Sequence, residues 1–563
     1  MRARAKSSVR AMLIGYEDQE NLGLRSIKAT LDSYGFHSVI IPYVPGNVSN
    51  VVSAVKEYNP DLVGISIIFQ YTFNEFGELA STLRKEGVRA HFTAGGHFPS
   101  LRPREVLEAL PDLDSVIRFE GEYTTLDLMR QLHRPETWDS IEGLVFRRGT
   151  DIVVNPPRPL IADLDALPQV KREPRMLTRG VKAVSMLASR GCLHNCSFCS
   201  IRQFYGGPPG RLRRTRKPEA VVAEMNALYE EDGVRLFIFQ DDDFAAKSRQ
   251  QRQWNESYLE ALSKSALSEK IRWKISCRVD DLDEDLFSRF REHGLIMIYL
   301  GVESGNPAGL KTLNKLVTVE QNHKAVELLK KIGIAFDMGF MLFDPDSTVD
   351  SIRENIHFLR RVTADGECPA NFCKMLPYAG TPIEARLIRE GRLKGTLSQP
   401  DYDFPDPRLD WFSLYAAMAF RFRNFDKLGL VERLRLAKFD LLLANAFEPG
   451  AWIAAYEREL RDLTARCSAV ALDYLETALD FIAARDVGGI MRDWPLLHSI
   501  AGPQWDEEIE IQQQLDSVLL GYNPALQSVF ENEFRRTSER QGAVGLSEAG
   551  SWPSGPPIQR LGV

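Results

Sequence analysis

The chain has 563 residues, of which 44% are apolar and 26% charged, a composition typical of globular proteins with several domains. Its net charge of −7 gives no electrostatic support to nucleic-acid binding, and no apolar run reaches the ~20 residues of a membrane-spanning helix. Seven cysteines in a chain of this length do not make a disulfide framework. The apolar run near the N-terminus is too short for a signal peptide, so we expect a cytoplasmic protein.

Residues 1–140 alternate short apolar runs with amphipathic stretches. Because the apolar runs are continuous and separated by helical patterns, they predict a parallel, doubly wound, Rossmann-like sheet. Ligands of such sheets bind at the carboxyl ends of the strands, where glycines gather in this chain; ordinary tight turns are the alternative. The expected strands are 11–15, 38–42, 62–68, 90–94 and 115–119, and the glycines are Gly15, Gly23, Gly95, Gly96 and Gly121.

Residues 141–180 are predicted to be a linker with a small hairpin, and residues 181–393 contain six strand-then-helix units. Six such units predict a partial (β/α)6 barrel, in which chemistry gathers at the carboxyl ends of the strands. The expected barrel strands are 184–188, 236–240, 271–276, 296–302, 335–341 and 371–376. Polar residues follow the second, third and fourth of them: Gln240, Asp241, Asp242, Asp243, Ser276, Arg278 and Glu303.

Three cysteines, Cys192, Cys196 and Cys199, form a C-x3-C-x2-C cluster shortly after the first barrel strand. Three thiolates can bind three irons of a [4Fe–4S] cluster and leave the fourth iron open to a small ligand. A zinc knuckle is the alternative, but structural zinc takes four ligands at paired spacings, and no second C-x2-C pair lies nearby. The other four cysteines are predicted to be small buried side chains.

This cysteine spacing resembles the signature of the radical S-adenosylmethionine (SAM) enzymes, in which an aromatic residue also precedes the last cysteine, as Phe198 does here. The resemblance implies that the open iron chelates SAM, whose one-electron cleavage gives a 5′-deoxyadenosyl radical. The segments FQDDDF, WKISCRVD and YLGVESG resemble the strand ends of the cobalamin-dependent members of that family. The implied SAM contacts are Phe198, Gln240, Asp241, Asp242, Asp243, Ser276, Arg278 and Glu303. The residues alone also allow a solvated acidic turn at 241–243 and a structural ion pair at Arg278.

The segments ENLGLRSI, DLVGISIIFQYT, TAGGHFPS and RFEGE resemble the cobalamin-binding domain that precedes many radical SAM domains. Where cobalamin domains with a histidine on cobalt carry D-x-H-x-x-G, this chain has Asp18 and Gly23 but Glu20 in the histidine position. We therefore expect base-off cobalamin without a protein histidine on cobalt, with His37 and His97 as alternatives. The implied cobalamin contacts are Asn21, Leu22, Gly23, Ser66, Phe69, Thr72, Gly95, Gly96, His97, Gly121 and Glu122.

Residues 394–534 carry apolar residues at helical spacing and predict an α-helical domain, while the Gly/Ser/Pro-rich residues 535–563 predict a disordered tail. The resemblance implies a C-methyltransferase that acts on an unactivated carbon through a 5′-deoxyadenosyl radical and methylcobalamin. A ring contraction, cyclisation or oxidation is the second hypothesis, and a cobalamin-binding sensor or carrier the third. We expect a small-molecule substrate, such as a natural-product or lipid intermediate, and an external electron donor such as flavodoxin or ferredoxin.

Overall fold

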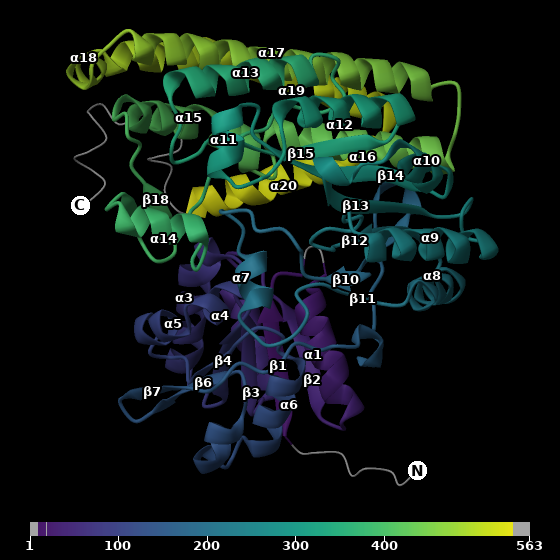
Figure 1. Ribbon diagram of the computed structural model, residues 1–563, viewed down its shortest axis with the longest axis vertical. Helices are drawn as coiled ribbons and strands as arrows, with labels where there is room; N and C mark the ends of the chain where they lie inside the picture. Colours follow the sequence, from purple (N-terminus) through teal and green to yellow (C-terminus); the bar gives the residue numbers. More distant parts are fainter. Residues whose placement is uncertain (1–8, 18–19, 544–563) are drawn as a thin grey trace. The chain divides into compact units, whose positions relative to one another are not determined.

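The structure is a computed structural model that describes residues 9–17 and 20–543, with side chains up to residue 533 (Figure 1). The chain divides into two compact units. The first contains Met1–Arg175, Lys182–Ser276 and Leu376–Tyr402, and the second contains Met176–Val181, Cys277–Met375 and Asp403–Val563. In the described residues, none of the helices is both long enough and apolar enough to cross a membrane.

A seven-stranded sheet forms the N-terminal part of the first unit, with strand order β2-β1-β3-β4-β5-β6-β7. The first five strands run parallel, as predicted, whereas β6 and β7 are antiparallel. The hairpin assigned to the linker thus extends this sheet, because β6 pairs with the edge of β5. The strands are β1 (Arg10–Gly15), β2 (His37–Pro42), β3 (Leu62–Ser66), β4 (His91–Gly95), β5 (Ser115–Ile117), β6 (Leu144–Arg148) and β7 (Asp151–Val154).

Helices cover both faces of this sheet, which confirms the doubly wound arrangement. Met12 and Ile14 pack with α2, α3 and α5 on one face, and Ala11 packs with α1 and α6 on the other. Because both faces are covered, the central strands are mostly apolar along their length, as in RAMLIG of β1 and LVGIS of β3. The helices are α1 (Leu22–Ser33), α2 (Val48–Tyr58), α3 (Phe73–Lys85), α4 (His97–Leu101), α5 (Pro103–Ala109) and α6 (Glu122–Gln131), and 3-10 turns are η1 (Gln70–Thr72) and η2 (Pro135–Ser140).

The first half of the predicted barrel completes the first unit. Strand β12 pairs in parallel with β9 on one side and with β13 on the other. Pro218 at the start of α8 and a left-handed Gly233 after its end explain where this helix begins and ends. The elements are β9 (Lys182–Met186), β10 (Ser189–Arg190), α7 (Ile201–Gly206), β11 (Arg214–Thr215), α8 (Pro218–Asp232), β12 (Val234–Phe239), α9 (Arg249–Lys264), β13 (Arg272–Arg278), α14 (Pro382–Arg389), β17 (Leu393–Gly395) and β18 (Pro400–Tyr402), with η3 (Leu164–Ala166) and β8 (Arg175–Met176) before them.

The second unit continues the alternation, so that each of the six strands β9, β12, β13, β14, β15 and β16 is followed by a helix along the chain. Strand β15 pairs in parallel with β14 and with the two-residue β16. The partial (β/α)6 pattern is therefore confirmed. The elements are η4 (Thr178–Gly180), η5 (Val279–Asp281), α10 (Glu284–Glu292), β14 (Leu295–Glu303), α11 (Pro307–Thr312), α12 (Val319–Ile332), β15 (Ala335–Phe343), α13 (Val349–Thr363) and β16 (Cys373–Lys374).

The remainder of the second unit is α-helical, as predicted. The long helices α17 and α19 lie side by side (Figure 1), and their buried apolar residues share a core with α16 and α20. Helix α20 continues to Ala543, beyond the predicted start of the tail, and residues 544–563 lie outside the described residues. The helices are α15 (Arg408–Phe425), α16 (Leu430–Phe447), α17 (Ile453–Ala483), α18 (Val487–Arg492), α19 (Trp494–Tyr522) and α20 (Pro524–Ala543).

A buried arginine joins three of these helical segments, and its loss should destabilise the second unit. Arg423 is 2% exposed, lies 3.3 Å from the Glu508 carboxylate, and donates to the carbonyls of Ala370 and Cys467. Arg423→Met should lower the free energy of unfolding by about 3 kcal/mol, because it leaves Glu508 buried without its partner. Urea unfolding followed by far-UV circular dichroism measures the change. The exposed neighbour Arg421→Met is the control, and an equal loss in both variants would contradict the assignment.

Candidate functional site

The three clustered cysteines lie on one loop between β10 and α7 of the first unit. Cys196 is buried, whereas Cys192 and Cys199 are half-buried, and the Cys199 N–H donates to the Cys196 carbonyl at 3.2 Å. Burial and the nearby Asp243 carboxylate raise the pKa of the Cys192 thiol to about 12. Free Cys192 is therefore a thiol at neutral pH, and a bound metal would have to displace its proton.

A glycine sets the path of the chain into this loop. Gly191 has a φ of +87°, and a Cβ at this position would lie 1.8 Å from the Leu212 carbonyl oxygen. Only a residue without a side chain fits both the left-handed backbone and this close approach. The loop therefore depends on a glycine directly before Cys192.

Two of the acids after β12 hold the backbone that leads into the loop. The buried Asp241 carboxylate accepts hydrogen bonds from the Ala188 N–H at 3.1 Å and from the Ser189 hydroxyl at 2.5 Å. Asp242 accepts from the Gly191 N–H at 2.9 Å. Burial raises the pKa of Asp241, and the hydrogen bonds from Ser189 and Ala188 oppose that shift. Both acids were predicted to contact SAM, and that contact stays a prediction; the observed hydrogen bonds show that both acids hold the loop backbone.

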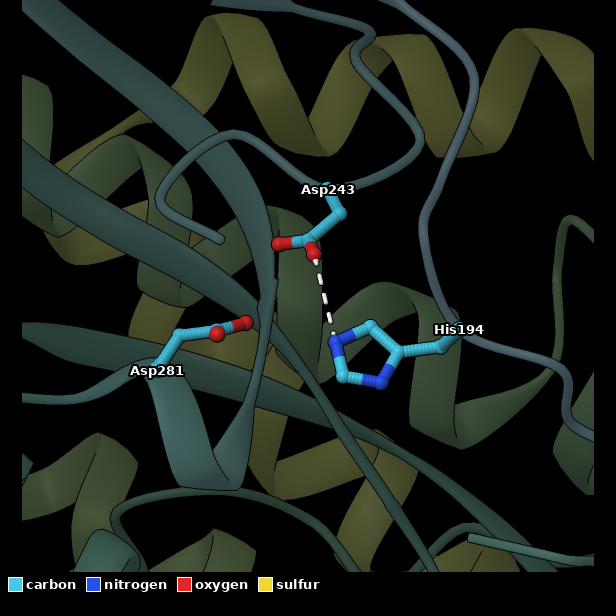
Figure 2. Close-up of side chains that lie close together, drawn as sticks. All are labelled: His194, Asp243 and Asp281. Atoms are coloured by element: carbon cyan, nitrogen blue, oxygen red, sulfur yellow. Dashed lines mark ion pairs between the residues drawn. The ribbon is translucent and has the colours of Figure 1, made fainter. Parts of the chain in front are cut away.

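Asp243 and His194 form a second contact of the cysteine loop with the end of β12. The His194 Nε2 atom lies 4.0 Å from an Asp243 carboxylate oxygen, and Figure 2 shows the ring directed toward that carboxylate. The Asp243 side chain is 1% exposed. Sequence reasoning selected Asp243 but missed His194. The position of His194 between Cys192 and Cys196 could have identified it as a residue of the site.

The other predicted SAM contacts of the first unit lie on the loop and at the strand ends. Gln240 donates to the Ser185 hydroxyl at 2.9 Å, and Phe198 is half-buried within the loop. Ser276 is half-buried on β13, and its carbonyl accepts from the Phe244 N–H at 3.0 Å. These positions are compatible with a ligand beside the loop, and their contact with SAM remains a prediction.

In the second unit, Arg278 forms the structural ion pair considered as the alternative. Its guanidinium donates to the Asp280 carboxylate at 2.9 and 3.3 Å and to the Lys315 carbonyl at 2.6 Å. Glu303 has a φ of +69° at the end of β14 and pairs with the Lys315 ammonium at 3.0 Å. Lys315 is 3% exposed. Sequence reasoning missed Lys315, because it follows Glu303 by twelve residues and belongs to no recognised motif.

The carboxyl ends of β1 and β3 bring several predicted cobalamin contacts together. Asn21 accepts from the Leu24 N–H at 3.1 Å, which caps α1, and its amide donates to the Ser66 hydroxyl at 3.1 Å. Leu22 and Gly23 form the first turn of α1. Asp18 lies outside the described residues.

The loop after β3 presents two aromatic rings to solvent. Phe69 and Tyr71 are 48% and 53% exposed and stack with ring centroids 5.4 Å apart. Gln70 fixes this loop, since its amide donates to the Leu397 carbonyl and accepts from the Ala379 N–H. Thr72 is buried, and its hydroxyl donates to the Phe69 carbonyl at 2.8 Å, so Thr72 supports the loop rather than facing outward.

The ends of β4 and β5 complete this edge of the sheet. Gly95 ends β4, and Gly96 has a φ of +111° with its missing Cβ only 2.4 Å from the Ile67 carbonyl oxygen. His97 begins α4 and packs against Phe204, with ring centroids 4.3 Å apart. Burial lowers the pKa of His97 to about 4, so its imidazole is neutral at pH 7.

Glu122 begins α6 directly after Gly121, and its carboxylate is already paired. It accepts from Arg190 at 2.6 Å and from the Ser26 hydroxyl at 2.7 Å. Although burial alone would raise its pKa, the charge of Arg190 makes the pKa of Glu122 lower than usual. A direct contact of Glu122 with cobalamin therefore remains a prediction.

Glu20 is buried, has a left-handed φ of 56°, and accepts a hydrogen bond from the Ser185 N–H of β9. Burial raises the pKa of its carboxyl, while this hydrogen bond opposes the shift. His37 is exposed at the first residue of β2. It therefore lies at the amino end of the strand, opposite the carboxyl ends of the strands, which we call the ligand edge of the sheet. The structure thus gives Glu20 a role between the sheet and β9, and it places His37 away from this edge.

Comparisons with known proteins agree with this geometry. The sequence model of the B12 binding domain matches residues 15–129, and that of the radical SAM superfamily matches residues 186–359. The chain is a B12-binding radical SAM protein. Its domains imply a [4Fe–4S] cluster, SAM and cobalamin as cofactors.

The individual relatives share less than 30% sequence identity with this chain. An uncharacterised methyltransferase of Pyrococcus horikoshii is 27% identical over 64% of this chain and 76% of the relative. The anaerobic magnesium-protoporphyrin IX monomethyl ester cyclase of Cereibacter sphaeroides is 28% identical over 64% of this chain, which spans only 58% of the cyclase. The solved structure of the cobalamin-dependent S-adenosylmethionine radical enzyme OxsB, with aqua-cobalamin and S-adenosylmethionine bound, aligns with 96% of this chain and 82% of its own, at 16% identity and a TM-score of 0.62. This last likeness shows the shared fold.

The residues of the first unit fit the implied cofactors. Three soft thiols on one loop match the donor set of an iron–sulfur cluster with one open iron. The edge built from Gly96, Ser66 and the exposed Phe69–Tyr71 stack offers close backbone approach and flat apolar surface to a macrocycle.

The cysteine assignment predicts the iron content of variants. Anaerobically reconstituted protein should hold one [4Fe–4S] cluster, and changing Cys192, Cys196 and Cys199 together to Ala should abolish it, because the thiolates are the ligands. Iron analysis and electron paramagnetic resonance (EPR) of the reduced protein measure the cluster. The control is Cys277→Ala, which removes a buried thiol outside the loop and should keep the iron. Retention of the cluster by the triple variant would refute the assignment.

The position of Glu20 predicts the EPR spectrum of bound cob(II)alamin. No nitrogen superhyperfine splitting should appear, because Glu20 faces β9 and we expect no histidine on the lower face of cobalt. The Glu20→Gln variant should bind cobalamin as well as the parent protein does. Splitting from one nitrogen would contradict this prediction, and its loss in His97→Phe would then identify the ligand.

Proposed function

We propose that the protein is a cobalamin-dependent radical SAM C-methyltransferase that acts on an unactivated carbon of a small molecule. The observation that supports this most directly is the direct contact, within the first unit, between the ligand edge of the B12-binding sheet and the segments around the cysteine loop. Glu20 and Glu122 bind β9 and β10, and His97 packs on α7. A cobalamin and a radical-generating cluster held in this way could serve one substrate.

Some residues of the chain would bind the cofactors, and others fix the backbone of the segments that bind them. Cys192, Cys196 and Cys199 would hold the cluster, and the Phe69–Tyr71 edge would receive cobalamin. Together, these cofactors supply a radical that removes hydrogen from carbon and a methyl group that replaces it. Asp241 and Asp242 fix the loop backbone, so that the thiols are presented in one arrangement.

Neutral and apolar side chains close the side of the sheet toward α7. His97 carries no charge at pH 7, and its ring lies against Phe204, which also packs against Phe119. Phe119 and Phe204 are both buried, so this packing places apolar surface between the sheet edge and α7. Exclusion of water would protect a carbon radical from side reactions.

A second candidate keeps both cofactors but gives no methylated product. The match to the magnesium-protoporphyrin IX monomethyl ester cyclase, which is as similar as the methyltransferase relative, favours this candidate. A cobalamin sensor or carrier is the third candidate; the complete cysteine triad argues against it, because a sensor has no need of an open iron. We infer that the protein is cytoplasmic and receives electrons from a flavodoxin or ferredoxin. Its substrate would be a natural-product or lipid intermediate.

Product stoichiometry tests methyl transfer. Each turnover should consume two SAM molecules, giving 5′-deoxyadenosine from hydrogen abstraction and S-adenosylhomocysteine from methyl donation. Both should rise with the methylated product in equal amounts, measured by liquid chromatography–mass spectrometry with a panel of candidate substrates. SAM with a trideuterated methyl should deliver all three deuterons, because the methyl group is transferred intact.

The Cys196→Ala variant is the matched control and should form neither 5′-deoxyadenosine nor methylated product. Substrate-dependent 5′-deoxyadenosine without S-adenosylhomocysteine would instead favour the ring-forming or oxidative candidate. S-adenosylhomocysteine without 5′-deoxyadenosine would indicate polar methyl transfer and contradict the radical part of the proposal.

A further inference from the structure

Arg190 lies two residues before Cys192, and its guanidinium is held between two carboxylates of the B12-binding sheet. It donates to Glu120 at 2.9 Å and to Glu122 at 2.6 Å, and its side chain is only 12% exposed. Glu120 and Glu122 flank Gly121 at the carboxyl end of β5, the edge at which ligands of such sheets bind. One side chain therefore connects the cysteine loop to the ligand edge of the sheet.

Further hydrogen bonds fix both carboxylates. Glu120 also accepts from Arg214 at 2.8 Å and from the Ile161 N–H at 2.7 Å. Glu122 also accepts from the Ser26 hydroxyl at 2.7 Å, and its side chain is 3% exposed. Two arginines and two glutamates thus balance their charges in a buried network, in which neither carboxylate can turn without losing a partner.

The same loop is held from its other side by the end of β12. Asp241 accepts hydrogen bonds from the Ala188 backbone N–H and from the Ser189 side-chain hydroxyl, and Asp242 accepts from the Gly191 N–H. Arg190 therefore sits in a short segment whose backbone is bound to the barrel and whose side chain is bound to the B12-binding sheet. A shift of the sheet edge would have to move the cysteine loop or break the ion pairs.

The stability of the fold alone does not explain why these residues are charged. Buried ion pairs are often replaced by apolar residues of similar volume without loss of stability, so charge here points to a requirement for geometry. Two carboxylates at fixed positions orient a planar guanidinium in a way that apolar contacts do not.

We propose that Arg190 is a positioning residue that sets the separation between cobalamin and the iron–sulfur cluster. This inference rests on the proposed function only in requiring that both cofactors are bound. Arg190 touches neither cofactor in this assignment; it acts through Glu120 and Glu122 on one side and through the loop backbone on the other.

The magnetic interaction between the two cofactors tests this assignment without substrate. In protein carrying cob(II)alamin and the reduced cluster, both centres are paramagnetic, and their interaction falls steeply with distance. EPR line shape and relaxation of the cobalt signal measure the interaction, and iron and cobalamin analyses measure occupancy. Arg190→Met should retain both cofactors but show a severalfold weaker or heterogeneous interaction. Arg190→Lys, which can pair with one carboxylate, should restore part of it.

A matched control separates positioning from a general loss of stability. Arg216 forms ion pairs with Asp165 and Glu224 in the same unit but makes no contact with Glu120 or Glu122 in the described residues. Arg216→Met should leave the magnetic interaction unchanged. If Arg216→Met weakens the interaction as much as Arg190→Met does, the positioning role is refuted.

The isosteric Glu122→Gln variant covers the case in which Arg190→Met loses its cluster. It keeps the hydrogen bonds but removes one charge, and it should show an intermediate interaction. A parent-like interaction in either variant overturns the inference, as does the lack of any interaction in the parent protein. Substrate-dependent 5′-deoxyadenosine without S-adenosylhomocysteine or a methylated product, together with a normal interaction, would refute the proposed function and leave this inference standing.

Discussion

Three carboxylates that accept hydrogen bonds from backbone N–H groups determine the course of the chain into the cysteine loop. Glu20 binds Ser185, Asp241 binds Ala188, and Asp242 binds Gly191. A buried N–H without a partner costs free energy, and a carboxylate is a strong acceptor, so each bond favours one backbone path. Because Glu20 lies in the loop after β1 of the B12-binding domain and both aspartates follow β12 of the barrel, these hydrogen bonds join the two ligand-binding parts of the first unit.

Much of the fold follows from local patterns in the sequence. Continuous apolar runs predicted the five parallel strands of the first sheet, and the structure shows α8 beginning at Pro218 and ending before the left-handed Gly233. The hairpin of β6 and β7 was recognised, but its pairing with β5 was not, because the partner of an edge strand is decided by tertiary contacts. The left-handed Phe119, which ends the fifth predicted strand early, likewise has no signal in local sequence.

For the candidate site, the sequence indicated which residues lie on the cysteine loop and at the strand ends, while their contacts with SAM and cobalamin stay predictions. The cysteine spacing located the loop, and the acids after β12 were identified as functional. In the structure, Asp241 and Asp242 accept hydrogen bonds from the loop backbone. Arg278 donates to the Asp280 carboxylate and to the Lys315 carbonyl. Sequence shows which polar groups stand at strand ends, but Asp241 and Asp242 bind residues that lie 53 and 51 positions earlier in the chain. Lys315 and the Arg190 network were missed for this reason.

The glycine before Cys192 has a consequence for how this protein can vary. Every amino-acid substitution at Gly191 adds at least a Cβ, which would overlap the Leu212 carbonyl oxygen, so we expect no substitution at this position to be neutral. Gly87 also has a positive φ, of +84°, yet nothing lies within 4 Å of its missing Cβ, and a replacement there meets only backbone strain. The two glycines should therefore differ sharply in the substitutions they tolerate, despite their similar backbone angles. We expect glycine to be retained at position 191 during evolution.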